Sequence, residues 1–161
     1  MSAEATWNAH GEGEQLWFLG THATIAVPGD ATGGRFALLE FLVPSGASPP
    51  LHSHSQDESY VVLEGGLTVV AGDRRFELGP GGAAVVPGGL PHTFRVDSES
   101  VRMLLISAPA GIEEFFRDAS VPAAEPTLPP EGTPEPSPEE LERIIEAHGQ
   151  AVHGPRLGPG D

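Results

Sequence analysis

The sequence predicts an all-β domain, a sandwich or a barrel, followed by short C-terminal helices. Short apolar runs recur between residues 21 and 110, and Gly, Pro or Asp residues separate them. No helical periodicity interrupts these runs, so strands and turns are expected throughout the region. The expected strands are Ala23–Val27, Phe36–Val43, Ser59–Leu63, Leu67–Ala71, Arg75–Leu78, Ala83–Val86, His92–Val96 and Val101–Ser107.

Residues 1–20 are expected to form an N-terminal arm that leads into the barrel of residues 21–110. The apolar cluster Leu16–Leu19 in this arm predicts an entry strand that folds onto the domain. Within the barrel, the segment Ala71–Arg74 predicts a hairpin turn between LTVV and RFEL. Gly72 favours this turn because glycine accepts a positive φ at low cost.

A short helix is expected at residues 111–119, directly after the barrel. Ile112, Phe115 and Phe116 have the i, i+3, i+4 spacing of one apolar helix face. The following residues, 120–137, are rich in Pro and Glu and predict an extended linker.

A second, amphipathic helix is expected at residues 137–149. Ser137 and Glu140 have the spacing of a capping box, and Pro138 lies at the first helical position. Gly149 is expected to end this helix. The remaining residues, 150–161, are expected to form a flexible tail.

The composition excludes several classes of function. The chain has 161 residues, 8 basic against 23 acidic side chains, and a formal net charge of −15. Such a charge argues against nucleic acid or an anionic membrane as a partner. The chain contains no cysteine and no lysine, which excludes thiolate nucleophiles, cysteine-ligated zinc and Schiff-base chemistry. No apolar stretch is long enough for a membrane span and no signal peptide is recognised, so a cytoplasmic location is expected.

A group of metal-ligating side chains lies in the segment GASPPLHSHSQDESYVVLEG. His52 and His54 are two residues apart, so on a strand both project from one face, and Glu58 has the same parity. Two imidazoles and a carboxylate on one face are typical ligands of a transition metal. A fourth ligand must come from another strand, and His92 is the natural candidate because it follows a Gly/Pro turn.

These residues resemble the two sequence motifs of the cupin superfamily. The first motif is matched at Gly46, His52, His54, Glu58 and Gly65. The second is matched at Gly81, Pro87, Gly89 and His92, whereas its final Asn is Val96 here, a position that is not a metal ligand. The phrases WFLG, GGRFALLEF, YVVLEG and GIEEFF resemble the quercetin 2,3-dioxygenase-like group of small bacterial cupins.

The resemblance implies a double-stranded β-helix with one divalent transition metal near one mouth. The implied ligands are His52, His54, Glu58 and His92, and one or two coordination positions would stay open, as in catalytic sites. The metal would be Fe, Mn, Ni, Co, Cu or Zn, since ligand identity alone does not select among them. The resemblance also implies a homodimer.

Glu58 is the predicted catalytic residue, because a carboxylate beside the metal can also take a proton from a substrate hydroxyl. Tyr60 shares the inward parity and is a candidate either to bind substrate or to fill the barrel. Further candidates for an apolar substrate pocket, with ordinary core packing as the alternative, are Phe36, Leu38, Leu42, Phe76, Phe94 and Met103.

Other polar residues are expected to be structural. Glu40 interrupts an apolar run and is expected to face solvent or to pair with an arginine. Outside the ligand spacing, the histidines expected to be structural or exposed are His10, His22, His148 and His153.

Three functions agree with these features. The first is a dioxygenase that acts on a flavonol or a related aromatic enol or phenol, with dioxygen as co-substrate. The second is a non-redox enzyme, such as an isomerase, epimerase or polyketide cyclase, that uses the metal as a Lewis acid. The third is a cupin that binds a small ligand or a metal without turnover. The metal site is common to all three, and the resemblance to the quercetin 2,3-dioxygenase-like group favours the dioxygenase.

Overall fold

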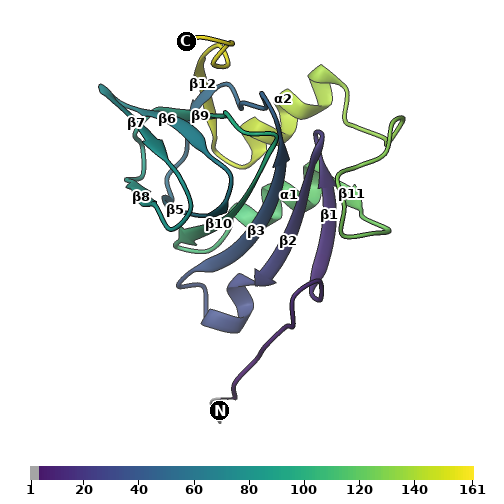
Figure 1. Cartoon of the computed structure of the whole chain (residues 1–161). Coiled ribbons are helices and arrows are strands. Elements are labelled where there is room, and N and C mark those ends of the chain that lie inside the picture. The colour runs from purple at the N-terminus through teal and green to yellow at the C-terminus, as the bar shows by residue number, and fades with distance from the viewer. Residues whose placement is uncertain (1–3) are drawn as a thin grey trace.

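The computed structural model describes residues 4–161, which fold into two antiparallel β-sheets with two short helices at one side (Figure 1). The larger sheet has the strand order β11-β1-β2-β3-β10-β5-β8, and the smaller one has the order β12-β4-β9-β6-β7. This arrangement is a jelly-roll barrel and confirms the predicted fold class.

The strands of the larger sheet are β1 (Glu14–Phe18), β2 (Thr21–Val27), β3 (Ala37–Pro44), β5 (Asp57–Glu64), β8 (Ala83–Val86), β10 (Ser100–Ala108) and β11 (Val121–Pro122). Those of the smaller sheet are β4 (Leu51–Ser53), β6 (Leu67–Ala71), β7 (Arg74–Leu78), β9 (His92–Val96) and β12 (Ala151–Gly154). A 3₁₀ helix, η1 (Gly29–Thr32), connects β2 to β3. The α-helices are α1 (Ile112–Ala119) and α2 (Pro138–Ala147).

The core lies between the two sheets and follows the alternation of side chains along each strand. On β3 and β10 every second residue is buried, including Leu39, Phe41, Met103 and Leu105. The helix α1 closes one end of this core, since Phe115 and Phe116 are buried. Its apolar face follows the spacing seen in the sequence.

The predicted hairpin turn and the predicted caps of the second helix are also present. Gly72 has a φ of 59° in the turn between β6 and β7. At the start of α2, the hydroxyl of Ser137 accepts the Glu140 amide hydrogen, and the Glu140 carboxylate accepts that of Ser137. The residue Gly149, with a φ of 69°, follows the C-terminal end of this helix.

Three short strands lie outside the predicted ones. They are β4, β11 and β12, and each depends on a partner that is distant in the sequence. The strand β12 pairs with β4, so residues 150–161 are not the flexible tail expected from their Gly and Pro content. Local sequence does not reveal these strands because they are short and contain or adjoin Pro or Gly.

Among residues 4–161, no helix is both long enough and apolar enough to cross a membrane.

Candidate metal centre

The predicted ligands come together where the two sheets face each other. His52 on β4 lies opposite His92 on β9 in the smaller sheet, and their ring centroids are 4.4 Å apart. His54 follows β4, and its ring centroid is 4.9 Å from that of His92. Glu58 reaches the same point from β5 of the larger sheet. The site thus joins the two sheets, as the parity and the two motifs indicate.

All three histidines are oriented by the main chain. Nδ1 of His52 is 2.8 Å from the carbonyl oxygen of Pro50, and Nδ1 of His92 is 2.8 Å from that of Leu90. Nδ1 of His54 is 3.2 Å from the carbonyl oxygen of Gln56. A carbonyl only accepts hydrogen bonds, so each Nδ1 carries a proton, and in the neutral ring Nε2 presents its lone pair. Such outer hydrogen bonds are typical of metal-ligating histidines.

Glu58 connects two of these rings and is almost completely buried. Its Oε1 lies 3.0 Å from Nε2 of His54, and its Oε2 lies 3.1 Å from Nε2 of His92. The hydroxyl of Tyr60 donates a hydrogen bond of 2.8 Å to the same Oε2. Tyr60 thus faces inward as predicted, and its hydroxyl contacts the carboxylate rather than the main chain.

The site favours an ionised Glu58 carboxylate and a neutral His52 imidazole. Burial, together with the neighbouring His92, lowers the pKa of His52 to about 4. Burial alone would raise the pKa of Glu58, but hydrogen bonds from His54 and His92 hold it well below its usual range. For His54, burial lowers the pKa, but the Glu58 carboxylate 3.0 Å from its Nε2 outweighs this and raises it. Burial and the Glu58 charge raise the pKa of Tyr60, which keeps its hydroxyl a proton donor.

The arrangement fits a divalent transition metal. One ligand nitrogen from each of His52, His54 and His92 lies within 4.8 Å of the other two. Although Nε2 of His54 is close to Glu58, it has no properly oriented hydrogen-bond partner among residues 4–161. An orphaned, buried imidazole nitrogen is costly unless a ligand satisfies it. The three-histidine cluster can therefore hold a metal.

A cavity of about 240 Å³ extends from this cluster towards the helices. Its metal end contains His52, Glu58 and Tyr60, and most of its remaining wall is apolar. Of the pocket residues predicted from the sequence, it is lined by Tyr60, Phe94 and Met103. Its further aromatic residues, which the sequence analysis did not select, are Phe18, Phe41, Phe115 and Phe116.

The other predicted pocket residues do not line this cavity, which corrects that part of the prediction. Leu38 and Leu42 project from the outer face of β3, and Phe36 directly precedes that strand with the same parity. Phe76 packs against the core from β7, the edge strand farthest from β4. On β3, Glu40 indicates which face points outward. A charged side chain on a strand marks the solvent-facing side, and Leu38 and Leu42 share its parity.

The C-terminal elements also contribute to the cavity. Leu141 and Ile145 of α2 line it, together with Gln150, Val152 and Arg156 from the following segment. The sequence alone does not show where the helix α2 packs relative to the barrel. The structure places the helix and the segment after it over the cavity that adjoins the histidine cluster.

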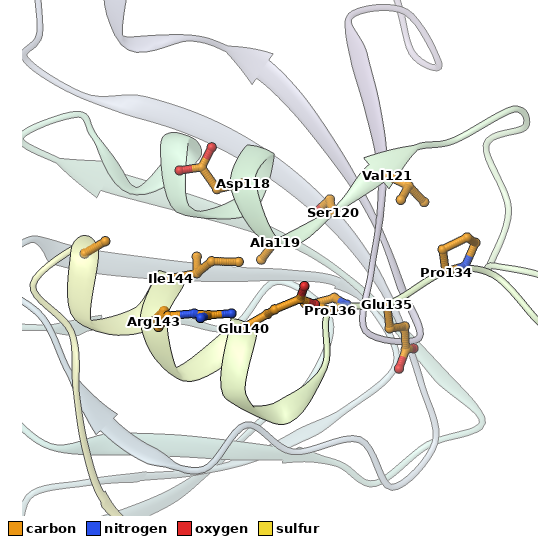
Figure 2. Close-up of a pocket in the computed structure, with 11 residues that line it drawn as sticks. Asp118, Ala119, Ser120, Val121, Pro134, Glu135, Pro136, Glu140, Arg143 and Ile144 are labelled. Carbon is orange, nitrogen blue, oxygen red and sulfur yellow. The ribbon is translucent and has the colours of Figure 1, made fainter.

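A second, more open groove lies on the other side of α2. It lies between the end of α1, the Pro-rich segment and α2 (Figure 2), and Asp118, Glu135, Glu140 and Arg143 contribute its charged side chains. It contains none of the predicted metal ligands.

The remaining polar residues have structural environments. Glu40 forms an ion pair of 2.6 Å with Arg102, and pairing with an arginine is one of the two environments expected for it. Nε2 of His10 also lies 3.4 Å from Glu40, and Nε2 of His148 lies 2.7 Å from Asp118. His22 is buried on β2, where burial lowers its pKa.

Comparison with known proteins supports the resemblance to the cupin superfamily. The model of the cupin domain family matches residues 39–107. Quercetin 2,3-dioxygenase of Bacillus subtilis is 30% identical over 138 residues, which cover 85% of this chain. The chain spans only 40% of the length of that relative.

Solved structures show the same fold at lower identity. KdgF from Halomonas sp. superposes with a TM-score of 0.59 at 17% identity, covering 68% of this chain and 99% of its own. The polyketide cyclase RemF from Streptomyces resistomycificus superposes with a TM-score of 0.57 at 24% identity. This match covers 86% of this chain and 92% of the RemF chain. The family match over residues 39–107, the two-sheet barrel and the clustered histidines agree with one another, and together they support the resemblance to the cupin superfamily.

Proposed function

We propose that this protein is a metal-dependent dioxygenase of the quercetin 2,3-dioxygenase-like type, acting on a flavonol or a related aromatic enol or phenol. The observation that carries the proposal is a set of three histidines, each fixed through Nδ1, that opens with Glu58 onto an apolar, aromatic-lined cavity. The similarity to the Bacillus subtilis dioxygenase supports this activity over others.

The residues of the site have separate roles in this proposal. His52, His54, His92 and Glu58 would hold one Fe, Mn, Ni, Co, Cu or Zn ion, which supplies Lewis acidity and, where redox-active, electron transfer. Glu58 would also accept the proton of the substrate hydroxyl, because it is the carboxylate that lies beside the histidines and lines the cavity. Tyr60 holds the Glu58 carboxylate in place through its 2.8 Å hydrogen bond.

The cavity walls would bind and orient the substrate. Phe94 and Phe41 offer ring faces and edges to a flat molecule, and Met103 fills the space between strands. The volume of about 240 Å³ lies below the common range of roughly 300–1,000 Å³ for ligand pockets. A compact aromatic enol therefore fits this site more easily than a large one.

The same groups would serve a non-redox reaction. A carboxylate base beside a Lewis-acidic metal also suits an isomerase, an epimerase or a polyketide cyclase. The two proposals differ in one requirement, since only the dioxygenase consumes dioxygen. A cupin that merely binds a ligand would show neither reaction.

Oxygen uptake tests the proposed activity. The protein is loaded separately with each of the six metals and given quercetin or 4-methylcatechol under air, with a His52→Ala variant beside it. We expect uptake that needs both the metal and His52, with carbon monoxide released from quercetin. Metal bound at one ion per chain without uptake on any substrate would contradict the dioxygenase and favour the non-redox alternative.

A further inference from the structure

The segment after α2 runs alongside the strand that carries His52. We call residues 150–161 the C-terminal strap. Its strand β12 pairs with β4 so that Val152 lies opposite His52 and Gly154 lies opposite Leu51. The strap thus forms the edge of the smaller sheet directly at the metal site.

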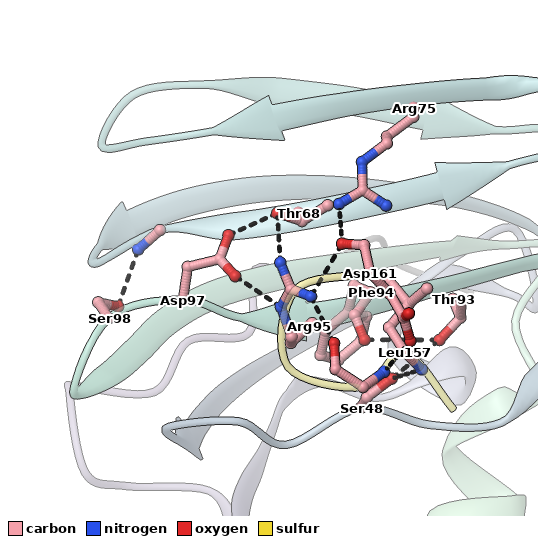
Figure 3. Close-up of polar contacts among 12 residues, drawn as sticks. Ser48, Thr68, Arg75, Thr93, Phe94, Arg95, Asp97, Ser98, Leu157 and Asp161 are labelled. Carbon is pink, nitrogen blue, oxygen red and sulfur yellow. Dashed lines mark hydrogen bonds and ion pairs between the residues drawn. The ribbon is translucent and has the colours of Figure 1, made fainter. Parts of the chain in front are cut away.

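Hydrogen bonds hold the far end of the strap in place (Figure 3). The main-chain nitrogen of Leu157 donates to the hydroxyl of Ser48 at 3.0 Å. Arg95 donates from Nη1 to the carbonyl oxygens of Gly158, at 2.6 Å, and Asp161, at 3.0 Å, and Arg75 also donates to Asp161. Arg156 lies between this anchored end and β12, so its main chain is fixed on both sides.

Arg156 is an exposed cation at the edge of the cavity without a protein partner. Its side chain contributes to the cavity wall, yet within residues 4–161 no hydrogen bond or ion pair engages its guanidinium. Within the described residues, ion pairs with acidic side chains are made by Arg95, Arg102 and Arg117, whereas Arg156 makes none and lies at the cavity. Gln150 lines the same cavity, and its side-chain amide has no hydrogen bond within the described residues either.

The spacing between the metal cluster and Arg156 limits what can bridge them. Arg156 is four residues beyond Val152, which lies opposite His52, and a strand rises about 3.3 Å per residue. The two main-chain positions are therefore at most about 14 Å apart, the reach of four fully extended residues. The flexible arginine side chain shortens the distance that a ligand must span.

We propose that Arg156, assisted by Gln150, determines specificity by binding an anionic group on the substrate, such as a carboxylate, while the substrate hydroxyls lie at the metal end. This inference rests on the proposed function and names the substrate class more closely. It describes a compact aromatic enol or phenol with an acidic substituent. A guanidinium suits this role because it binds carboxylates through paired hydrogen bonds.

Binding of matched probes to the Co(II)-loaded protein tests this inference without turnover. The probes are 3,4-dihydroxybenzoate, 3,4-dihydroxyphenylacetate and 3-(3,4-dihydroxyphenyl)propanoate, each compared with the alkylcatechol of the same chain length. Affinity is measured by calorimetry under argon, and the visible Co(II) spectrum reports contact with the metal. The variants are Arg156→Gln, Arg156→Lys and Gln150→Leu, with Arg143→Gln in the separate groove as the control.

We expect one carboxylate probe to bind about tenfold more tightly than its alkyl partner. This preference should disappear in Arg156→Gln, weaken in Gln150→Leu, persist in part in Arg156→Lys and remain in Arg143→Gln. Equal binding of all pairs, with the Co(II) spectrum still perturbed, would overturn the role of Arg156 and leave the proposed function standing. If no probe perturbs the Co(II) spectrum, this inference and the phenol-binding part of the proposed function both fail.

Discussion

At the scale of single residues, the orientation of the histidine rings is the feature that determines the chemistry of the site. A carbonyl acceptor at each Nδ1 selects one tautomer, so three Nε2 lone pairs face the same point. A structural histidine has no need for this arrangement. Of the other histidines, His10, His148 and His153 contact groups at the surface, whereas His22 is buried on β2.

This difference predicts the effect of single substitutions on metal binding. We expect the wild-type protein to bind one Zn(II) or Co(II) ion per chain, and His54→Ala to weaken binding by at least about tenfold, because a ligand and its fixed orientation are lost. Competition with a chromophoric chelator measures the affinity. His153→Ala should bind like the wild type, and equal loss in both variants would refute the assigned ligand set.

Tyr60 should act on the metal through Glu58. Tyr60→Phe removes the donor to Oε2 of Glu58 but keeps the ring, so the carboxylate loses one constraint. We expect the metal affinity to fall about tenfold while circular dichroism and the thermal midpoint change little. Met103→Leu, a change of similar size in the same cavity, should leave metal affinity unaltered. An unchanged affinity in Tyr60→Phe would show that the hydroxyl does not support Glu58.

The sequence predicts the ligands better than the pocket, and the reason is physical. Ligands on one face of a strand lie an even number of residues apart. The spacing of His52, His54 and Glu58 therefore marks them as one set in the sequence. Along β3, both parities are apolar on either side of Glu40, and only that one charge distinguishes the inner face. Leu38 was therefore selected although Phe41 lines the cavity.

At the scale of elements, the C-terminal strap shows why a tail rich in Gly and Pro can still be ordered. Its contacts are all long-range: β12 pairs with β4, and Arg95 on β9 holds the segment that follows. Neither partner can be identified from the local sequence of the strap. The helix α2, by contrast, carries its own capping signals and was predicted from them.

Asp97 keeps Arg95 in position and gives this anchor a predictable dependence on pH. Burial raises the pKa of Asp97, but hydrogen bonds from Thr68 and Arg95 outweigh it, so the folded pKa lies below the usual value of 3.8. The resulting stabilisation is complete above about pH 3.8 and is lost as the pH falls through the lower, folded-state value.

The variant Asp97→Asn tests this anchor. We expect its free energy of unfolding to be about 0.5–1 kcal/mol below that of the wild type at pH 7, since the pair is partly exposed. The difference should persist to about pH 4 and shrink at lower pH, where the wild-type carboxylate is protonated as well. Urea denaturation between pH 7 and pH 3 measures it, with Glu77→Gln on β7 as the control. A difference that grows on acidification would contradict the assigned pKa shift.

At the scale of the whole molecule, one face of the larger sheet is unusually apolar. The burial of β3, β10 and β5 alternates, so the residues between the core positions project to the outside. Register aligns them across the strands: Leu38 lies beside Ile106, and Leu104 lies beside Val61. The apolar residues of this outer face are Phe36, Leu38, Leu42, Val61, Leu63, Val85, Leu104 and Ile106.

We expect a second copy of the chain to cover this outer face, in line with the homodimer predicted from the sequence. Two molecules that each carry a charge of −15 repel one another, and an apolar sheet face lets them meet with little charge repulsion. A twofold axis brings the same face of both copies together, which a sheet surface allows. Sedimentation should show a dimer for the wild type and a monomer for Leu104→Glu, because the new carboxylate would lie opposite Glu40 and both charges would be desolvated in the interface. Arg143→Glu, away from this face, should stay dimeric. A monomeric wild type at micromolar concentration would contradict the prediction, whereas a dimer that Leu104→Glu does not dissociate would place the interface elsewhere.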